Sequence, residues 1–263
     1  AIPELWADRV QQWNVVADEC GPNVHPADRY QLFQTLFGAW SDEGTSPRFE
    51  ERILAWQQKS LRETRLRSSW EDPDLDYEKK AARLVSNLLA NQNFASNLAQ
   101  FVKQMALASR INSLVQTTLK FCLPGVPDIY QGCELEDFSL VDPDNRRAVD
   151  YARRKALLAM RDVGGNGKLQ LVHRLLSMRR DNPELFASGT YKPVLVEGPR
   201  AGHVLGFTRS HRDVRLTCAF MIRAAATVAA TGDLPPAEWW RDTHLVLDEI
   251  VPAHRLFAHE PFL

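Results

Sequence analysis

The sequence has few cysteines and no recognisable metal-binding spacing. Its four cysteines are Cys20, Cys122, Cys133 and Cys218, and none of them forms a Cys-x-x-Cys pair. A disulfide framework is unusual in a chain of 263 residues, so we expect reduced cysteines and a cytoplasmic protein. The histidines show no His-Glu-x-x-His spacing, and we therefore expect neither a metal centre nor a cofactor.

The chain also lacks an excess of charge, a long apolar run and a signal peptide. Its formal net charge is −1 at pH 7, which argues against nucleic acid as a partner. No run approaches the roughly 18 apolar residues of a membrane span, so we expect no membrane partner. The opening AIPELWADRV is typical of a first helical turn with Pro3 at its first position. We expect the chain to begin partway through a larger protein.

The sequence does contain many apolar residues: 44% are hydrophobic and 25% are charged. This is enough for a hydrophobic core and for more than one packing unit. Three segments differ in pattern. We predict a helical segment over residues 1–110, a mixed α/β segment over 111–185 and a small antiparallel β domain over 186–263.

Apolar residues recur at helical spacing through residues 1–110. Asp72 and Pro73 are predicted to be the N-cap and the first residue of one of these helices. The stripes that predict the helices are Trp6, Val10 and Trp13; Tyr30, Phe33, Leu36 and Phe37; Phe49, Ile53, Trp56 and Leu61; Leu84, Val85, Leu88 and Leu89; and Phe94, Leu98, Phe101, Val102 and Met105.

The middle segment alternates helix and strand signals. NSLVQTTLKFCL (112–123) is predicted to run from helix into strand. VPDIYQG (126–132) is short, apolar and bounded by Gly125 and Gly132, which favours a buried strand. VDYARRKALLAM and KLQLVHRLLSMRRDNPEL predict two helices separated by Gly-Gly-Asn-Gly. Beyond residue 189, TYKPVLVEG, HVLGFTRS and VRLTCAFMI are short strand candidates separated by turn residues.

A polar loop, ELEDFSLVDPDNRR (134–147), follows the predicted buried strand. Loops at the carboxyl ends of strands collect the chemistry of α/β proteins. Carboxylates and guanidinium groups can hydrogen-bond sugar hydroxyls, and an arginine can hold a carboxylate in place. Charge alone would equally suit a solvated loop whose ions pair locally.

The order of residues resembles a known family. PGVPDIYQGCE is similar to the last barrel strand of the α-amylase superfamily, glycoside hydrolase family 13, and DPDNRR to the loop that follows it. Within that superfamily, LVQTTLKFCLPGVPDIYQGCELEDFSLVDPDNRR and ERILAWQQKSLRETRLRSSWEDPDLDYE resemble segments of the maltooligosyltrehalose synthases. The resemblance covers about residues 4–210. Ala148, where these enzymes usually have proline, is among the departures.

The resemblance implies a fold larger than this chain. Members have a (β/α)8 barrel whose catalytic carboxylates follow the fourth, fifth and seventh strands. This chain resembles the part after the seventh strand: a helical insert, the eighth strand, the last helices and the C-terminal β domain. The nucleophile Asp, the acid/base Glu and the third Asp are therefore expected outside it, and the chain alone is expected to be inactive.

The implied reaction is an intramolecular transglucosylation that turns the reducing-end α-1,4 link of a maltooligosaccharide into an α,α-1,1 link. The detached glucose must be retained while water is excluded. On this basis we expect no catalytic residue in the chain. The substrate-binding candidates are Asp142, Asp144, Asn145, Arg146 and Arg147, then Asp137, Glu134 and Tyr130, and a second cluster of Lys59, Arg62, Glu63, Ser69 and Trp70.

Alternatives remain for several of these residues. The second cluster would equally suit a solvated helix face or structural ion pairs, and Tyr130 a partly buried core position. The chain as a whole could instead be a non-catalytic carbohydrate-binding or structural module. The expected partners are a maltooligosaccharide and the missing N-terminal barrel portion, and exposed barrel surface could drive self-association.

Overall fold

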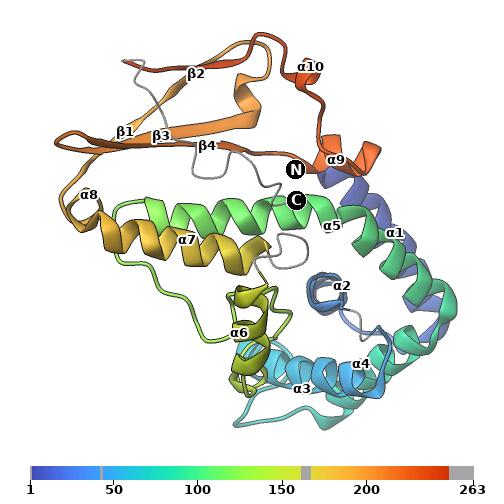
Figure 1. Cartoon of the computed structure of the whole chain (residues 1–263). Coiled ribbons are helices and arrows are strands. Elements are labelled where there is room, and N and C mark those ends of the chain that lie inside the picture. Colours follow the sequence, from blue (N-terminus) through green and yellow to red (C-terminus); the bar gives the residue numbers. More distant parts are fainter. Residues whose placement is uncertain (1, 42–43, 161–166, 249–263) are drawn as a thin grey trace. The chain divides into compact units, whose positions relative to one another are not determined.

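The computed structural model describes residues 2–41, 44–160 and 167–248 and divides into two compact units (Figure 1). We call the first the helical unit; it comprises Ile2–Gln104 and Phe138–Ala148. We call the second the mixed unit; it comprises Met105–Asp137 and the chain from Val149 onward. The three-part division expected from the sequence stays a prediction.

The helical unit is built from four helices and the first part of a fifth. Three of the helices begin with proline at the first helical turn, where the missing N–H costs nothing. The first of these starts at Pro3, as predicted. The helices are α1 (Pro3–Cys20), α2 (Pro26–Ala39), α3 (Pro47–Thr64), α4 (Leu75–Ala90) and α5 (Gln92–Cys122), which continues into the mixed unit.

The start of α4 corrects one sequence prediction. The N-cap is Asp74, whose carboxylate accepts the Tyr77 N–H at 2.9 Å, and not Asp72. Asp72 is instead held in the preceding turn, because its N–H donates to Ser69 Oγ at 2.8 Å and its carbonyl accepts the Ser69 N–H at 3.2 Å. The predicted N-cap, Asp72, therefore lies two residues before the observed one, Asp74.

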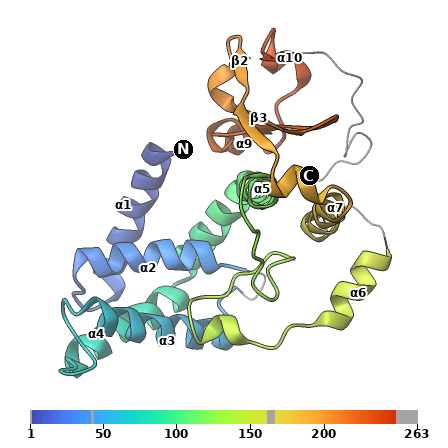
Figure 2. The ribbon, with the colours of Figure 1, turned by 90° about the vertical axis from the view of Figure 1, so that its left-hand side faces the viewer.

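The core of the helical unit is aromatic. Trp13 is buried between Phe33, Phe94 and Phe101, with ring centroids 5.7–6.0 Å apart. Its indole N–H donates to Asn97 Oδ1 at 2.9 Å, so the one polar atom of the side chain is satisfied. Figure 2 shows α1, α2, α3 and α4 as separate helical segments of this unit. The helical stripes of the sequence analysis supply these buried residues.

The mixed unit contains the second part of α5, further helices and two small antiparallel sheets. The three-stranded sheet has the order β1-β3-β4, and the two-stranded sheet pairs β2 with β5. The elements are α6 (Tyr151–Ala159), α7 (Gly167–Asp181), α8 (Pro183–Ala187), β1 (Thr190–Pro193), β2 (Leu195–Glu197), β3 (Val204–His211), β4 (Val214–Met221), α9 (Ala225–Thr231), α10 (Ala237–Trp240) and β5 (His244–Val246).

Helices α5 and α7 cover one face of the three-stranded sheet (Figures 1 and 2). The shared core cluster is made of Phe121 and Cys122 from α5, Leu175 from α7, Phe207 from β3 and Cys218 from β4, with further residues of α7. The predicted helices and the strands beyond residue 189 are confirmed within the described residues. Residues 249–263 of the predicted β domain lie outside them.

A buried arginine ties the segments of this unit together. Arg209 on β3 is only 1% exposed. Its guanidinium donates to the carbonyls of Cys122, Thr190, Leu185, Phe186 and Gly189 at 3.0–3.2 Å. These carbonyls belong to the end of α5, to α8, to the connecting residue Gly189 and to the start of β1. Arg209 thus supplies donors to backbone acceptors of several segments, three of them in buried hydrogen bonds.

The predicted buried strand at 125–131 is wrong for this chain. α5 continues as helix to Cys122, and the residues after it form no strand. Val126 is 96% exposed and Tyr130 is also exposed. Gly125 and Gly132 do bound the segment, with φ of +132° and +95° that other residues rarely adopt. The segment has no neighbouring strand to pair with among the described residues, and a strand needs one.

The fold class is therefore mixed α and β, with small antiparallel sheets. No helix in the described part of the chain is long and apolar enough to cross a membrane.

Candidate functional site

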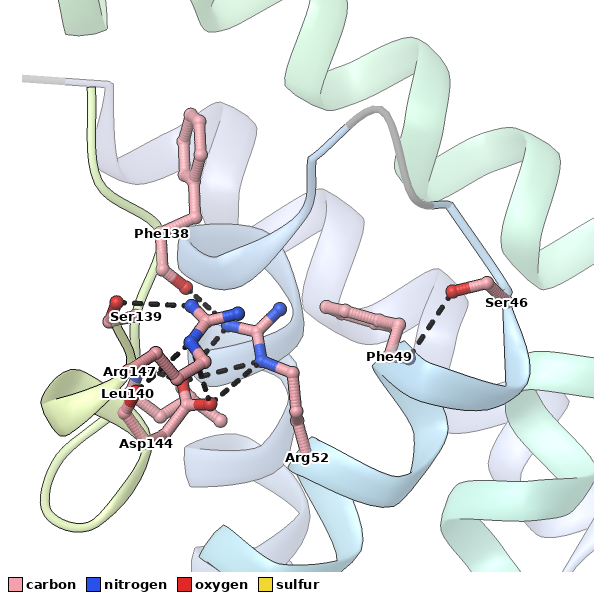
Figure 3. Close-up of polar contacts among 8 residues, drawn as sticks. All are labelled: Ser46, Phe49, Arg52, Phe138, Ser139, Leu140, Asp144 and Arg147. Carbon is pink, nitrogen blue, oxygen red and sulfur yellow. Dashed lines mark hydrogen bonds and ion pairs between the residues drawn. The ribbon is translucent and has the colours of Figure 1, made fainter. Parts of the chain in front are cut away.

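The polar loop of the sequence analysis is fixed to α3 in the helical unit (Figure 3). Arg52 of α3 makes two parallel contacts with the Asp144 carboxylate: Nε lies 3.0 Å from Oδ1 and Nη2 lies 3.1 Å from Oδ2. Nη2 also donates to the Phe138 carbonyl at 2.6 Å. One arginine therefore contacts both the beginning and the middle of the segment 138–148.

Local sequence places Arg52 where it can do this. Ser46 caps α3 by accepting the Phe49 N–H at 3.2 Å, and Pro47 follows as the first residue of the helix. Phe49 is buried, and its ring lies 6.0 Å from the Arg52 guanidinium carbon. Because the cap fixes the start of the helix, Arg52 leaves α3 close to the buried aromatic ring that borders the loop.

The Arg52–Asp144 pair is largely shielded from water, with side chains 10% and 14% exposed. Burial alone would raise the pKa of Asp144. The hydrogen bonds from Arg52 and from the Leu140 N–H outweigh burial, so the pKa lies below its usual value. Asp144 is consequently a charged acceptor at neutral pH.

Asp144 is also the centre of contacts within the loop. Its Oδ2 accepts the Leu140 N–H at 2.6 Å. Arg147 donates from Nε to the Asp144 carbonyl at 3.0 Å and from Nη2 to Ser139 Oγ at 3.1 Å, and its Nε lies 3.5 Å from Asp144 Oδ1. Two arginines therefore approach one carboxylate, one from α3 and one from the loop itself (Figure 3).

Lys59, two helical turns after Arg52 on α3, contacts a second point of the loop. Its Nζ donates to the Asp142 carbonyl at 2.6 Å and lies 4.0 Å from Asp142 Oδ2. The same ammonium lies 3.7 Å from Glu63. Asp142 also forms an ion pair with Arg146, whose side chain is exposed. Lys59 therefore contacts Glu63 of its own predicted cluster and Asp142 of the first.

Both adjacent arginines pair within the loop, Arg146 with Asp142 and Arg147 with Asp144. Asn145 Oδ1 is buried, and no hydrogen bond reaches it from the described residues.

Of the remaining members of the second cluster, Arg62 pairs with a buried glutamate, Glu78. Arg62 donates from Nε and Nη2 to the two carboxylate oxygens of Glu78 at 2.7 and 2.8 Å. Ser68 Oγ donates to the same carboxylate at 2.5 Å, and Gln58 Nε2 lies 3.4 Å away. The hydrogen bonds from Arg62, followed by those from Ser68 and Gln58, overcome the cost of burial and lower the pKa of Glu78 to about 2.

Trp70 lies against this ion pair. The Arg62 guanidinium carbon is 4.9 Å from the centre of the Trp70 ring, while the indole as a whole remains exposed. Ser69 is engaged in the turn before α4. A cavity of about 420 Å³ opens between α3 and α4 beside Glu78, and its walls are mostly apolar, including Leu54, Leu61 and Leu75. The cluster thus places the exposed Trp70 ring beside the Arg62 guanidinium, which Glu78 holds in position.

Three predicted residues belong to the mixed unit. Glu134 Oε2 accepts from Arg154 Nε at 3.1 Å, and Arg154 Nη2 donates to the Gly132 carbonyl at 2.7 Å. Cys133 Sγ lies 3.5 Å from Asp137 Oδ2. Tyr130 is exposed, so the partly buried core position considered for it does not apply.

Sequence reasoning missed the two residues that organise these clusters. Arg52 precedes Lys59 by two helical turns and lies on the same side of α3, a spacing that could have been noticed. Glu78, the partner of Arg62, lies 16 residues later in the first turn of the next helix, and no local pattern indicates the contact. Among the described residues no group of three potential metal ligands gathers.

Comparison with known proteins gives a consistent set of relatives. No protein-family model matches the chain. A curated protein of Mycobacterium tuberculosis (strain ATCC 25618 / H37Rv) that carries the name maltooligosyl trehalose synthase is 33% identical over 265 residues. The alignment covers 99% of this chain and 34% of the relative. The chain thus spans about a third of the length of the curated relatives that it matches.

Solved structures agree with the sequence relatives. Maltooligosyltrehalose synthase from Arthrobacter ramosus shares 33% identity at a TM-score of 0.71, over 89% of this chain and 30% of that one. A hypothetical maltooligosyl trehalose synthase from Sulfolobus tokodaii shares 30% identity at a TM-score of 0.67, over 80% of this chain and 29% of that one.

Proposed function

The chain belongs to the maltooligosyl trehalose synthase family, and we propose that it is the C-terminal portion of an intramolecular transglucosylase of this family. The complete enzyme converts the reducing-end α-1,4 link of a maltooligosaccharide to an α,α-1,1 link. The observation that carries the proposal is similarity over nearly the whole chain to named synthases about three times as long. A non-catalytic module has no comparable support.

In this proposal the catalytic carboxylates lie in the preceding two thirds of the enzyme, within a (β/α)8 barrel. A retaining mechanism requires one carboxylate as nucleophile and one carboxylic acid that protonates the leaving oxygen. The detached glucose then has to turn and attack the glycosyl-enzyme through its anomeric hydroxyl before water does. The chain contributes the enclosure of the acceptor side, through the loop 138–148 and the helices that fix it.

The exposed segment after α5 supports a missing barrel portion. Val126 is 96% exposed and Tyr130 is exposed, although both are large hydrophobic side chains. The segment forms no strand here, but β-branched and aromatic residues such as these are favoured in strands that have a neighbour to pair with. We propose that residues 125–131 complete the barrel as its eighth strand when the preceding portion is present, and that they promote self-association when it is absent. Location in the cytoplasm belongs to the same proposal.

We predict that this chain alone forms no trehalose-ended product and releases no glucose from maltopentaose, because it lacks the catalytic carboxylates. The complete enzyme under the same conditions should yield a non-reducing product. Both are incubated with maltopentaose, and products are separated by chromatography with and without reducing-end labelling. Turnover by the pure chain would contradict the assignment of the carboxylates, and no trehalose-ended product from the complete enzyme would contradict the proposed function.

We predict that Arg147→Lys in the complete enzyme raises the ratio of free glucose to trehalose-ended product more than Arg146→Lys does. Arg147 contacts both Asp144 and Ser139 and is 38% exposed, and lysine lacks the planar fork that makes these contacts together. Arg146 is 69% exposed and pairs with Asp142. Both ratios are measured from maltopentaose, with thermal unfolding as a check on the fold. Equal ratios and rates in both variants and the parent would mean a purely solvated loop.

A further inference from the structure

We propose that Arg52 is a positioning residue that fixes the loop 138–148 and thereby sets the partition between transglucosylation and hydrolysis. This inference rests on the proposed function. Arg52 lies 86 residues before Phe138 in sequence and 92 before Asp144, yet it hydrogen-bonds both. Neither the relatives' names nor the sequence pattern assigns it a role.

The contacts of Arg52 are suited to hold the loop in one shape. The guanidinium meets the loop at the Phe138 carbonyl and at the Asp144 carboxylate, so it fixes the distance between these two points. Asp144 in turn accepts the Leu140 N–H, which closes the backbone between them. The loop is thus folded around one ionic centre (Figure 3).

Burial makes this centre difficult to replace. The two side chains are 10% and 14% exposed, so water substitutes poorly for either partner once the other is removed. A bidentate guanidinium also fixes orientation, which a lysine ammonium does not. Lys59, by contrast, holds the Asp142 carbonyl by a single hydrogen bond.

The consequence for the reaction concerns the acceptor. If the loop encloses the detached glucose, a mobile loop admits water to the glycosyl-enzyme and releases glucose before it can turn. Cleavage of the first bond depends on carboxylates elsewhere and should change less. Loss of Arg52 should therefore alter the product ratio more strongly than the rate of substrate consumption.

The test compares Arg52→Gln and Arg52→Lys with Arg83→Gln in the complete enzyme. Arg83 is an exposed arginine of α4 in the same unit, and no contact to its side chain is found among the described residues. Two quantities are measured: the ratio of free glucose to trehalose-ended product from maltopentaose, and hydrogen exchange of the Leu140 amide. Substrate consumption and thermal unfolding are recorded alongside them.

For Arg52→Gln we expect the glucose ratio and the exchange rate of Leu140 each to rise about tenfold, with a smaller change in substrate consumption. Arg52→Lys should lie between Arg52→Gln and the parent, and Arg83→Gln should match the parent.

Two outcomes would overturn the inference. An unchanged glucose ratio with faster Leu140 exchange would mean that Arg52 orders the loop but has no influence on the partition. Unchanged exchange in Arg52→Gln would mean that Arg52 does not hold the loop at all. If instead the parent makes no trehalose-ended product, the proposed function fails, and the exchange data still decide whether Arg52 anchors the loop.

Discussion

Replacement of Arg209 by methionine is expected to destabilise the mixed unit by about 4 kcal/mol or more. The guanidinium donates to five carbonyls, from α5, α8, the connecting residue Gly189 and β1, and Arg209 is 1% exposed. Methionine fills part of the volume but donates no hydrogen bond, so each carbonyl would lose this donor, including the three in buried bonds. Each such group costs about 1–3 kcal/mol, and together they should outweigh the benefit of removing a buried charge.

The prediction is checked by chemical denaturation of Arg209→Met against Arg153→Met. Arg153 is an exposed arginine on α6 of the same unit, and its side chain contacts none of the described residues. We expect the Arg153 variant to unfold within about 0.5 kcal/mol of the parent. Arg209→Lys should be intermediate, since an ammonium reaches fewer of the carbonyls. Equal stability of the two methionine variants would show that Arg209 does not hold these segments together.

The helices were largely predictable because their signals are local. Stripes such as Trp6–Val10–Trp13 reflect burial on one side of a helix, and proline at the first turn marks its start. The Asp72 and Asp74 error shows the limit of such signals. Two aspartates two residues apart can each cap a helix; here Asp74 caps α4, and Asp72 is held in the turn with Ser69.

The buried strand failed for a different reason. Apolar, β-branched composition at 126–131 indicates a surface that is buried in its final setting, but a strand also needs a neighbour on its backbone. The described residues provide none, so Val126 is left exposed. Composition alone therefore did not predict the structure of this segment.

The sequence indicated candidate residues but not how they contact one another. The candidates include Lys59 of α3 and the loop residues Asp142, Asp144, Arg146 and Arg147. That the loop is held by α3 was not predicted. Arg52 and Asp144 are 92 residues apart, and one sequence gives no means of pairing charges over such a separation. Local pairing of the loop ions, considered as an alternative, is present for both loop arginines. It coexists with the contacts to α3.

The second large effect is expected for Glu78→Gln, which should lower the free energy of unfolding at pH 7 by roughly 2–3 kcal/mol. The Glu78 side chain is 8% exposed and accepts two hydrogen bonds from Arg62 and one from Ser68. The neutral amide loses the ionic attraction, and its NH2 group would face donors. Arg62 would also be freed from the position in which it supports Trp70.

The pKa of Glu78 adds a signature in pH. It is lowered from 4.5 to about 2 by its partners, so the unfolded state binds the proton more tightly than the folded state. The stabilisation is therefore complete above pH 4.5 and is lost as the pH falls toward 2. The free energy of unfolding of the parent should fall as the pH is lowered across that window. In Glu78→Gln, which has no carboxyl group at this position, that part of the pH dependence should be absent.

The matched control is Glu71→Gln. Glu71 also pairs with an arginine, Arg65 at 2.7 Å, but both side chains are about two-thirds exposed, and such pairs contribute about 0–1 kcal/mol. Unfolding by urea is measured for the parent and both variants at pH 7, 5 and 3. If Glu78→Gln is no less stable than Glu71→Gln at pH 7, or the two variants keep the same slope between pH 5 and 3, the Arg62–Glu78 pair does not fix this part of the helical unit. Trp70 would then be a surface side chain without a rigid support, and its place among the substrate-binding candidates would have to be given up.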